Sequence, residues 1–199
     1  DYAEAHSTLG VTLNDLGQLE EAVKSYEQAL AIKPDYAEAH SNLGNTLKEL
    51  GQLEAAVKSY EQALAIKPDY AEAHSNLGNT LNDLGQPEEA VKSYEQALAI
   101  KPDYAEAHYN LGATFQELRQ REEAVKSYEQ ALAIKPDYAE AHSNLGVTLK
   151  ELGQLDAAVK SYEQALAIKP DYAEAHSNLG NTLNDLGQLE AAIKRSEEH

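Results

Sequence analysis

The chain contains no cysteine, methionine or tryptophan, and a single phenylalanine. The absence of cysteine excludes disulfide bonds and thiol chemistry, although it leaves the compartment of the protein open. No run of 18 apolar residues occurs, so the sequence predicts no membrane-spanning helix. No signal peptide can be recognised. The composition therefore excludes integral membrane proteins of the helical type and disulfide scaffolds.

Basic residues are also scarce. Lys and Arg number 16 against 34 Asp and Glu, which gives a formal net charge of -18 at pH 7. Binding of DNA or RNA needs cations that neutralise phosphates, so this excess of acid argues against nucleic-acid partners. It favours basic partners and fast encounter with them.

One block of 34 residues repeats along the whole chain. It fills residues 1–34, 35–68, 69–102, 103–136 and 137–170, and a partial copy occupies 171–199. A fixed period of this length predicts stacked supersecondary units, so we expect a single array over 1–199. Because the chain stops within a block, we also expect it to be a fragment of a longer protein.

Proline and glycine divide each block into two helices. Positions are numbered so that Asp1 is position 1. We expect helix A from about position 2 to 16 and helix B from about position 19 to 32, where Pro34 ends the block. The glycines predicted to end helix A in the left-handed conformation are Gly17, Gly51, Gly85, Gly153 and Gly187. The sequence thus predicts an all-α protein of helix pairs.

Two further signals concern the starts of the helices. Asp35 is predicted to cap the next helix A, with Glu38 three residues later. Pro87 suits the first turn of a helix B, where its missing N–H costs nothing.

The apolar residues fall at helical spacing on both helices. In the first block they are Leu9, Leu13, Leu16, Ala22, Val23, Tyr26, Ala29, Leu30 and Ile32. Gly10 is expected opposite Ala22 and Ala29, which would let the two helices approach closely. One such pair buries too little surface to be stable alone, so neighbouring pairs must stack.

These residues resemble the tetratricopeptide repeat along all 199 residues. The matching residues of the first block are His6, Leu9, Gly10, Leu13, Ala22, Tyr26, Ala29 and Pro34. In this chain His replaces the family's first aromatic residue, and Leu replaces the second except at Phe115. The resemblance implies a right-handed α-solenoid superhelix of antiparallel helix pairs. It also implies that helix A lines a concave groove for extended peptides.

The wording HSNLGNTLKELGQ is most similar to the repeats of O-linked N-acetylglucosamine transferases. In that group an asparagine before Leu-Gly forms a ladder that binds peptide backbone, because an amide both donates and accepts hydrogen bonds. The matching residues are Asn42, Asn76, Asn110, Asn144 and Asn178, and Thr8 interrupts the ladder in the first block. The alternative is that these asparagines only solvate a polar helix face.

Co-chaperones with the same repeat bind acidic tails through a clamp of Lys and Arg. The matching positions here are 7 and 11, and neither holds a cation in any block. Binding of an acidic C-terminal tail by such a clamp is therefore not expected.

A metal site is not expected at the repeated histidines. Four residues flank His6 at the spacing that a second helical ligand would need, namely Tyr2, Ala3, Leu9 and Gly10, and none is a usual ligand. We interpret the six histidines as half-buried replacements of the family aromatic. No nucleophile–base pair or phosphate-binding glycine loop can be picked out, so no enzymatic activity and no cofactor are predicted.

The fourth block departs most from the others. Tyr109, Ala113 and Gln116 lie at i, i+4 and i+7 on the helix-A stripe, and Arg119 replaces the glycine after helix A. Two interpretations stay open here, a side-chain pocket or a copy that has drifted. If the backbone at Arg119 is left-handed, it costs roughly 1 kcal/mol.

The sequence therefore predicts a non-enzymatic module that binds an extended, basic peptide or protein segment. The predicted contact residues on helix A are Asn42, Asn76, Asn110, Asn144, Asn178, Asn45, Asn79, Asn181, Tyr109, Gln116, Glu38, Glu72, Glu106 and Glu140. Further carboxylates at position 15 are Asp15, Glu49, Asp83, Glu117, Glu151 and Asp185, with Lys48 and Lys150 as opposing cations. The alternatives are a self-assembling scaffold, a designed array without a ligand, and the substrate-recruiting segment of a glycosyltransferase.

The ends of the array carry a separate prediction. Helix A of the first block lacks a preceding helix B, and the last helix B is cut short at His199, with Ser196 in place of tyrosine. We expect weak head-to-tail self-association through these ends, because a heterologous contact of this kind can propagate.

Overall fold

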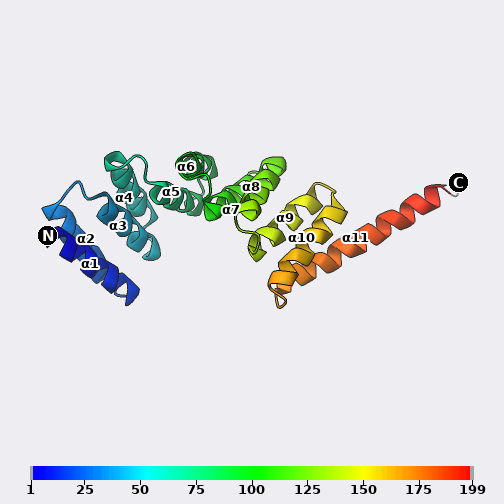
Figure 1. Ribbon diagram of the computed structural model, residues 1–199, viewed down its shortest axis with the longest axis horizontal. Coiled ribbons are helices and arrows are strands. Elements are labelled where there is room, and N and C mark those ends of the chain that lie inside the picture. Colours follow the sequence, from blue (N-terminus) through cyan, green and yellow to red (C-terminus); the bar gives the residue numbers. More distant parts are fainter. Residues whose placement is uncertain (1, 198–199) are drawn as a thin grey trace. The chain divides into compact units, whose positions relative to one another are not determined.

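The computed structural model describes the backbone of residues 2–197 and the side chains of residues 2–189. The chain divides into two compact units, Asp1–Pro102 and Asp103–His199. The first unit holds α1 (Tyr2–Asp15), α2 (Leu19–Ile32), α3 (Ala37–Glu49), α4 (Leu53–Ile66), α5 (Ala71–Asp83) and α6 (Pro87–Ile100). The second holds α7 (Ala105–Glu117), α8 (Arg121–Ile134), α9 (Ala139–Glu151), α10 (Leu155–Ile168) and α11 (Ala173–Glu197) (Figure 1).

The described residues form helices only, as predicted, and consecutive helices pack as antiparallel pairs within each unit. Helix B spans positions 19 to 32 as expected, and Pro87 begins α6. None of the described helices is long and apolar enough to cross a membrane.

The turn within each pair is held by backbone hydrogen bonds around a left-handed residue. Gly51 has φ +74, its N–H donates to the Lys48 carbonyl at 2.9 Å, and the Gln52 N–H donates to the Leu47 carbonyl at 2.8 Å. These two bonds define a Schellman motif. Gly17, Gly85 and Gly153 share the conformation, which confirms four of the five predicted glycines. Arg119 also adopts it, with φ 60.

The turn between blocks corrects the predicted cap. Asp35 does not cap α3, because the N-cap residue is Tyr36, whose side chain makes no capping hydrogen bond. Proline and aspartate form the middle of a tight turn between blocks. In the turn around Pro68 and Asp69, the Tyr70 N–H donates a hydrogen bond to the Lys67 carbonyl at 3.3 Å. Proline suits the second position of such a turn. Asp35 is therefore one residue too early to act as a cap.

Gly10 and its equivalents make room for an aromatic ring. A Cβ atom on Gly44 would lie 2.7 Å from Cε1 of Tyr60, and one on Gly10 would lie equally close to Tyr26. The atoms nearest to a Cβ on Gly10 thus belong to Tyr26, a residue that the sequence analysis did not place there, while Ala22 and Ala29 are fully buried on the same helix. The close approach is between the helix-A backbone and a buried tyrosine of helix B.

Neighbouring pairs share one core, as the stacking argument required. In the first unit, Leu43 and Leu47 of α3 pack in one cluster with Tyr26 of α2 and Tyr60 of α4. In the second unit, the corresponding cluster contains Tyr128, Leu145, Leu149 and Tyr162, with Ala124 and Ala158. Helices α3 and α9 are thus each held by their own helix B and by the preceding one.

The last block does not repeat this turn. α11 continues through Gly187, so the prediction that Gly187 ends a helix was wrong. The sequence supplies the reason, because positions 25, 26 and 29, which hold Ser, Tyr and Ala in the other blocks, hold Arg195, Ser196 and His199. Gly180 accordingly has no ring within 4 Å.

Glycine inside a helix costs about 1 kcal/mol relative to alanine, whereas burial of a large apolar side chain contributes about 1.5–3 kcal/mol. Without the tyrosine, the continuous helix has the lower free energy. His199, where helix B was expected to be cut short, lies outside the described residues, as does the side chain of Ser196.

Candidate functional site

Helices α1, α3 and α5 of the first unit line a groove of about 600 Å³, together with two tyrosines from α2 and α4. Its residues are Val11, Asn14, Asp15, Tyr26, Asn42, Asn45, Thr46, Lys48, Glu49, Tyr60 and Asn76. Helix A supplies nine of these eleven residues. The groove therefore follows the helix-A face that the sequence analysis singled out.

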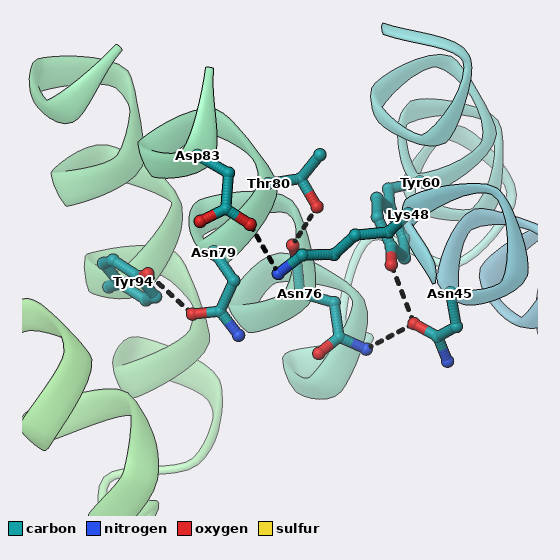
Figure 2. Close-up of polar contacts among 8 residues, drawn as sticks. All are labelled: Asn45, Lys48, Tyr60, Asn76, Asn79, Thr80, Asp83 and Tyr94. Carbon is teal, nitrogen blue, oxygen red and sulfur yellow. Dashed lines mark hydrogen bonds and ion pairs between the residues drawn. The ribbon is translucent and has the colours of Figure 1, made fainter. Parts of the chain in front are cut away.

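The asparagines of the groove form hydrogen bonds between neighbouring blocks. Asn45 Oδ1 accepts a bond from the Tyr60 hydroxyl at 2.7 Å and a second from Asn76 Nδ2 at 3.0 Å (Figure 2). One block later, the Tyr94 hydroxyl donates to Asn79 Oδ1 at 2.7 Å. The sequence analysis selected these asparagines and missed the tyrosine hydroxyls that hold them.

Burial keeps these hydroxyls protonated. Desolvation raises the pKa of Tyr60 well above its ordinary value, and it raises the pKa of Tyr26 to about 12. At neutral pH the Tyr60 phenol is therefore a proton donor, and Asn45 Oδ1 is its acceptor.

The floor of the groove carries a second polar chain, between the first two blocks. The Thr46 hydroxyl donates to Asn14 Oδ1 at 2.6 Å, and Asn14 Nδ2 donates to Glu49 Oε1 at 3.3 Å. Asp15 and Glu49 are exposed, so the groove presents two carboxylates to solvent.

Lysine at position 14 pairs with the acid of the next block. Lys48 Nζ lies 3.0 Å from Asp83 Oδ2, and Lys150 Nζ lies 2.9 Å from Asp185 Oδ2. The one lysine that lines the groove is therefore already paired with a carboxylate outside it.

The glutamates predicted at position 4 lie apart from this groove and have partners of their own. Glu38 pairs with Lys67 at 3.3 Å, Glu72 with Lys101 at 3.3 Å, and Glu140 with Lys169 at 3.8 Å. A hydrogen bond from its own backbone N–H, followed by the Lys67 ammonium, lowers the pKa of Glu38. Sequence reasoning missed these lysines, because each pair joins the start of helix A to the residue after helix B.

The same lysines also contact the tyrosine of the following block. Lys67 Nζ lies 4.6 Å from the ring centroid of Tyr70, and Lys169 Nζ lies 4.8 Å from that of Tyr172. Such cation–π contacts contribute about 0.5–1 kcal/mol at exposed sites. Within each unit, this part of the block therefore joins consecutive repeats.

In the fourth block, aromatic rings occupy the helix-A stripe. The Tyr109 ring centroid lies 4.8 Å from that of Tyr138 and 5.9 Å from that of Tyr128. Asn144 Nδ2 donates to the Tyr109 hydroxyl at 3.0 Å, and the Tyr128 hydroxyl donates to Gln116 Oε1 at 3.0 Å. Tyr109 and Gln116 thus belong to the packing of the second unit.

The remaining predicted contact residues lie outside the groove. Asn110 is half-buried on α7, while Glu106 is exposed on the same helix. On α11, Asn178 is half-buried and Asn181 is exposed. The structure therefore brings together Asn42, Asn45 and Asn76 of the predicted set and adds Asn14 and two tyrosines.

The histidines join consecutive blocks. His40 Nε2 lies 2.9 Å from the carbonyl oxygen of Pro34, and His74, His142 and His176 repeat the contact with Pro68, Pro136 and Pro170. A carbonyl only accepts, so Nε2 carries the proton and donates. Within the described residues, no group of three metal-binding side chains occurs. Of these four histidines, His40, His74 and His142 are half-buried, whereas His176 is exposed.

The sequence and the fold were compared with protein families and with solved structures. The family model described as TPR repeat matches residues 10–51, 44–85, 78–118, 120–153 and 148–187. No curated protein matches the sequence. A crystal structure of MamA is 26% identical with a TM-score of 0.77, and the match covers 83% of this chain and 96% of that chain.

Two other solved structures show the same fold. TTC0263, a thermophilic TPR protein in Thermus thermophilus, is 28% identical with a TM-score of 0.67, covering 91% of this chain and 98% of that one. YrrB, described as a TPR protein with an unusual peptide-binding site, is 24% identical with a TM-score of 0.74, covering 86% of this chain and 89% of that one.

Proposed function

The chain belongs to the tetratricopeptide (TPR) repeat family, and on this premise we propose that it is a non-enzymatic module that binds extended, basic peptide segments. Repeat proteins of this kind use long concave surfaces for partners, and TPR proteins generally serve in protein interaction. The observation that carries the proposal is the groove of α1, α3 and α5, whose lining combines side-chain amides with exposed carboxylates.

Two features support a peptide as the ligand. Amides on successive blocks suit a backbone that presents N–H and C=O groups at regular intervals, irrespective of its sequence. YrrB, which shares the fold, is described as having a peptide-binding site, although an unusual one.

Charge supports a basic ligand. Asp15 and Glu49 line the groove, and its one cation, Lys48, is paired with Asp83. The net charge of -18 repels anions and speeds the approach of cations. The glutamates at position 4 contribute less than the sequence suggested, because lysines of the same blocks pair with them.

The test is a peptide-binding titration by fluorescence anisotropy at low and high salt. A lysine-rich decapeptide should bind more tightly than a glutamate-rich decapeptide, and its affinity should fall as salt rises. Glu49→Gln should weaken binding of the basic peptide by about 2- to 5-fold. The matched control is Glu61→Gln on α4, which removes the same charge from an exposed residue outside the groove. Equal or tighter binding of the acidic peptide would contradict the proposal.

Self-association is a second candidate function, favoured by the exposed face of α1. Leu9 is 48% exposed and Leu16 is 67% exposed, whereas Leu43, the equivalent of Leu9 in the next block, is 9% exposed. A second copy would cover this face by a head-to-tail contact. The test is small-angle scattering over a concentration series. Assemblies that grow with concentration would support this candidate, and a monomer at every concentration would contradict it.

A third candidate is the substrate-recruiting segment of a larger glycosyltransferase. Its only support is the resemblance of the segment HSNLGNTLKELGQ that the sequence analysis noted. The complete reading frame decides it, because the candidate fails if no catalytic domain follows these repeats.

A further inference from the structure

A buried tyrosine hydroxyl holds a side-chain amide in one orientation in three of the blocks. The pairs are Tyr60 with Asn45 at 2.7 Å, Tyr94 with Asn79 at 2.7 Å, and Tyr128 with Gln116 at 3.0 Å. In each pair the phenol donates and the amide oxygen accepts. The NH₂ group of the amide is therefore the end that is left for other contacts.

Asn45 carries a second constraint besides the phenol. Its Oδ1 accepts from the Tyr60 hydroxyl and also from Asn76 Nδ2. A flipped amide would set its own NH₂ against the NH₂ of Asn76 and would leave the phenol proton without an acceptor. A buried hydroxyl without an acceptor costs about 1–3 kcal/mol, so the observed orientation is strongly preferred.

Asn45 lines the groove, and its nitrogen is the end of the amide that neither Tyr60 nor Asn76 holds. Figure 2 shows Nδ2 of Asn45 directed away from both Tyr60 and Asn76, and Nδ2 of Asn79 directed away from Tyr94. Asn45 lines the groove and is half-buried. Within the described part of the chain, no residue accepts a hydrogen bond from Asn45 Nδ2.

Resting on the proposed peptide-binding function, we infer that Asn45 offers N–H donors to the backbone carbonyl oxygens of the peptide, and that Tyr60 is the positioning residue that fixes this polarity. Next to Asn45, the groove would then bind groups of the ligand that accept hydrogen bonds. A free carboxylate is disfavoured as that acceptor, because Asp15 and Glu49 line the same groove. The neutral carbonyl of an extended backbone, flanked by basic side chains, fits both features.

The chain contains natural comparisons for this arrangement. Position 11 is Val147 in the fifth block, and there the buried hydroxyl of Tyr162 has no hydrogen-bond partner among the described residues. Tyr162 thus occurs in a block without an amide partner for its hydroxyl, and its ring fills the space over Gly146. The ring serves packing in every complete block, and the hydroxyl acts on an amide only where position 11 or 14 provides one.

The experiment compares Tyr60→Phe with Tyr162→Phe in the full chain. Both variants keep the ring and remove one buried hydroxyl, so both should fold, which circular dichroism checks. The probe is the lysine-rich decapeptide of the binding titration. Tyr60→Phe should weaken its binding by about 3- to 10-fold, the range expected for the loss of one oriented hydrogen bond. Tyr162→Phe should leave the affinity unchanged.

A spectroscopic readout separates positioning from general damage. The side-chain ¹⁵N–¹H resonances of Asn45 should shift in free Tyr60→Phe and stay in place in Tyr162→Phe. A third variant, Asn45→Asp, replaces the donor by an acceptor and should lose backbone binding even though it adds negative charge to the groove.

The outcomes are distinct. If the wild-type chain does not bind the peptide, the proposed function fails and the inference fails with it. If the wild-type chain binds and Tyr60→Phe binds equally well, the inference alone is overturned. Tighter binding by Asn45→Asp would also overturn it, because charge would then outweigh the amide donor.

Discussion

Single residues decide how each helix pair closes. After helix A the backbone takes the left-handed conformation, which Gly17, Gly51, Gly85 and Gly153 adopt without strain. Arg119 adopts it with φ 60 in the fourth block. A side chain other than glycine costs about 1–2 kcal/mol there, so the fourth turn is the strained one.

Replacement of this arginine should therefore stabilise the protein. We expect Arg119→Gly to raise the free energy of unfolding by about 1 kcal/mol, after allowance for the greater chain entropy of glycine. The measurement is urea denaturation followed by circular dichroism.

The matched control is Gly85→Ala, which should lower the free energy of unfolding. A Cβ atom at Gly85 meets no atom within 4 Å, so its effect reports the backbone conformation alone. A stabilising Gly85→Ala would contradict the argument for both sites.

Several contacts between residues lay beyond what the sequence could predict. In the first five blocks, the i,i+4 pattern and the Pro and Gly positions predicted the helices to within a residue or two, because these signals are local. The contact of Tyr60 with Gly44 and its bond to Asn45 join two helices, and they depend on the depth at which those helices pack. Asn45 could be chosen as a site residue from its helix face, but the orientation of its side-chain amide could be seen only in the structure.

At the level of helices, α11 shows what the tyrosine of helix B does. In five blocks this ring covers the glycine of helix A, and the chain turns back after position 17 or its Arg119 equivalent. In the last block the tyrosine is replaced by Ser196, and the helix runs on. Leu183 is consequently 49% exposed, while Leu149 in the preceding block is 7% exposed.

Restoration of the block sequence should restore the turn. In the double variant Arg195→Ser with Ser196→Tyr, we expect Gly187 to leave the helical conformation and become left-handed, because a ring is again available to pack on Gly180. Backbone chemical shifts of Gly187, with Gly153 as the left-handed reference, measure the change.

The single variant Arg195→Ser is the control, since it lacks the ring and should keep Gly187 helical. Helical shifts at Gly187 in the double variant would show that the tyrosine does not decide the turn.

For the chain as a whole, the repeat explains both the ease and the limits of prediction. Near-identical blocks made the helix pairs and their shared core predictable, because each block must bury its apolar face against its neighbours. The departures from the block were harder to interpret. Tyr109 in the fourth block proved to pack on Tyr138, and Gly187 in the last block proved to be helical. The prediction of one continuous array over 1–199 stays a prediction.

The buried tyrosines, repeated in every complete block, predict how the protein responds to alkaline pH. Burial raises the pKa of Tyr26 and Tyr162 to about 12, and it raises the pKa of Tyr60 and Tyr128 in the same direction. In the unfolded chain a tyrosine has a pKa of about 10. The unfolded state therefore loses these protons first as pH rises.

Stability should accordingly be complete below about pH 10 and should fall as pH rises through the range from 10 to 12. Each buried tyrosine contributes a slope of about 1.4 kcal/mol per pH unit in that range, because the folded state then holds one more proton than the unfolded state. Urea denaturation at a series of pH values, followed by circular dichroism, measures the slope. Tyr162→Phe should reduce it by one proton. A slope that Tyr162→Phe leaves unchanged would refute the assignment to buried tyrosines.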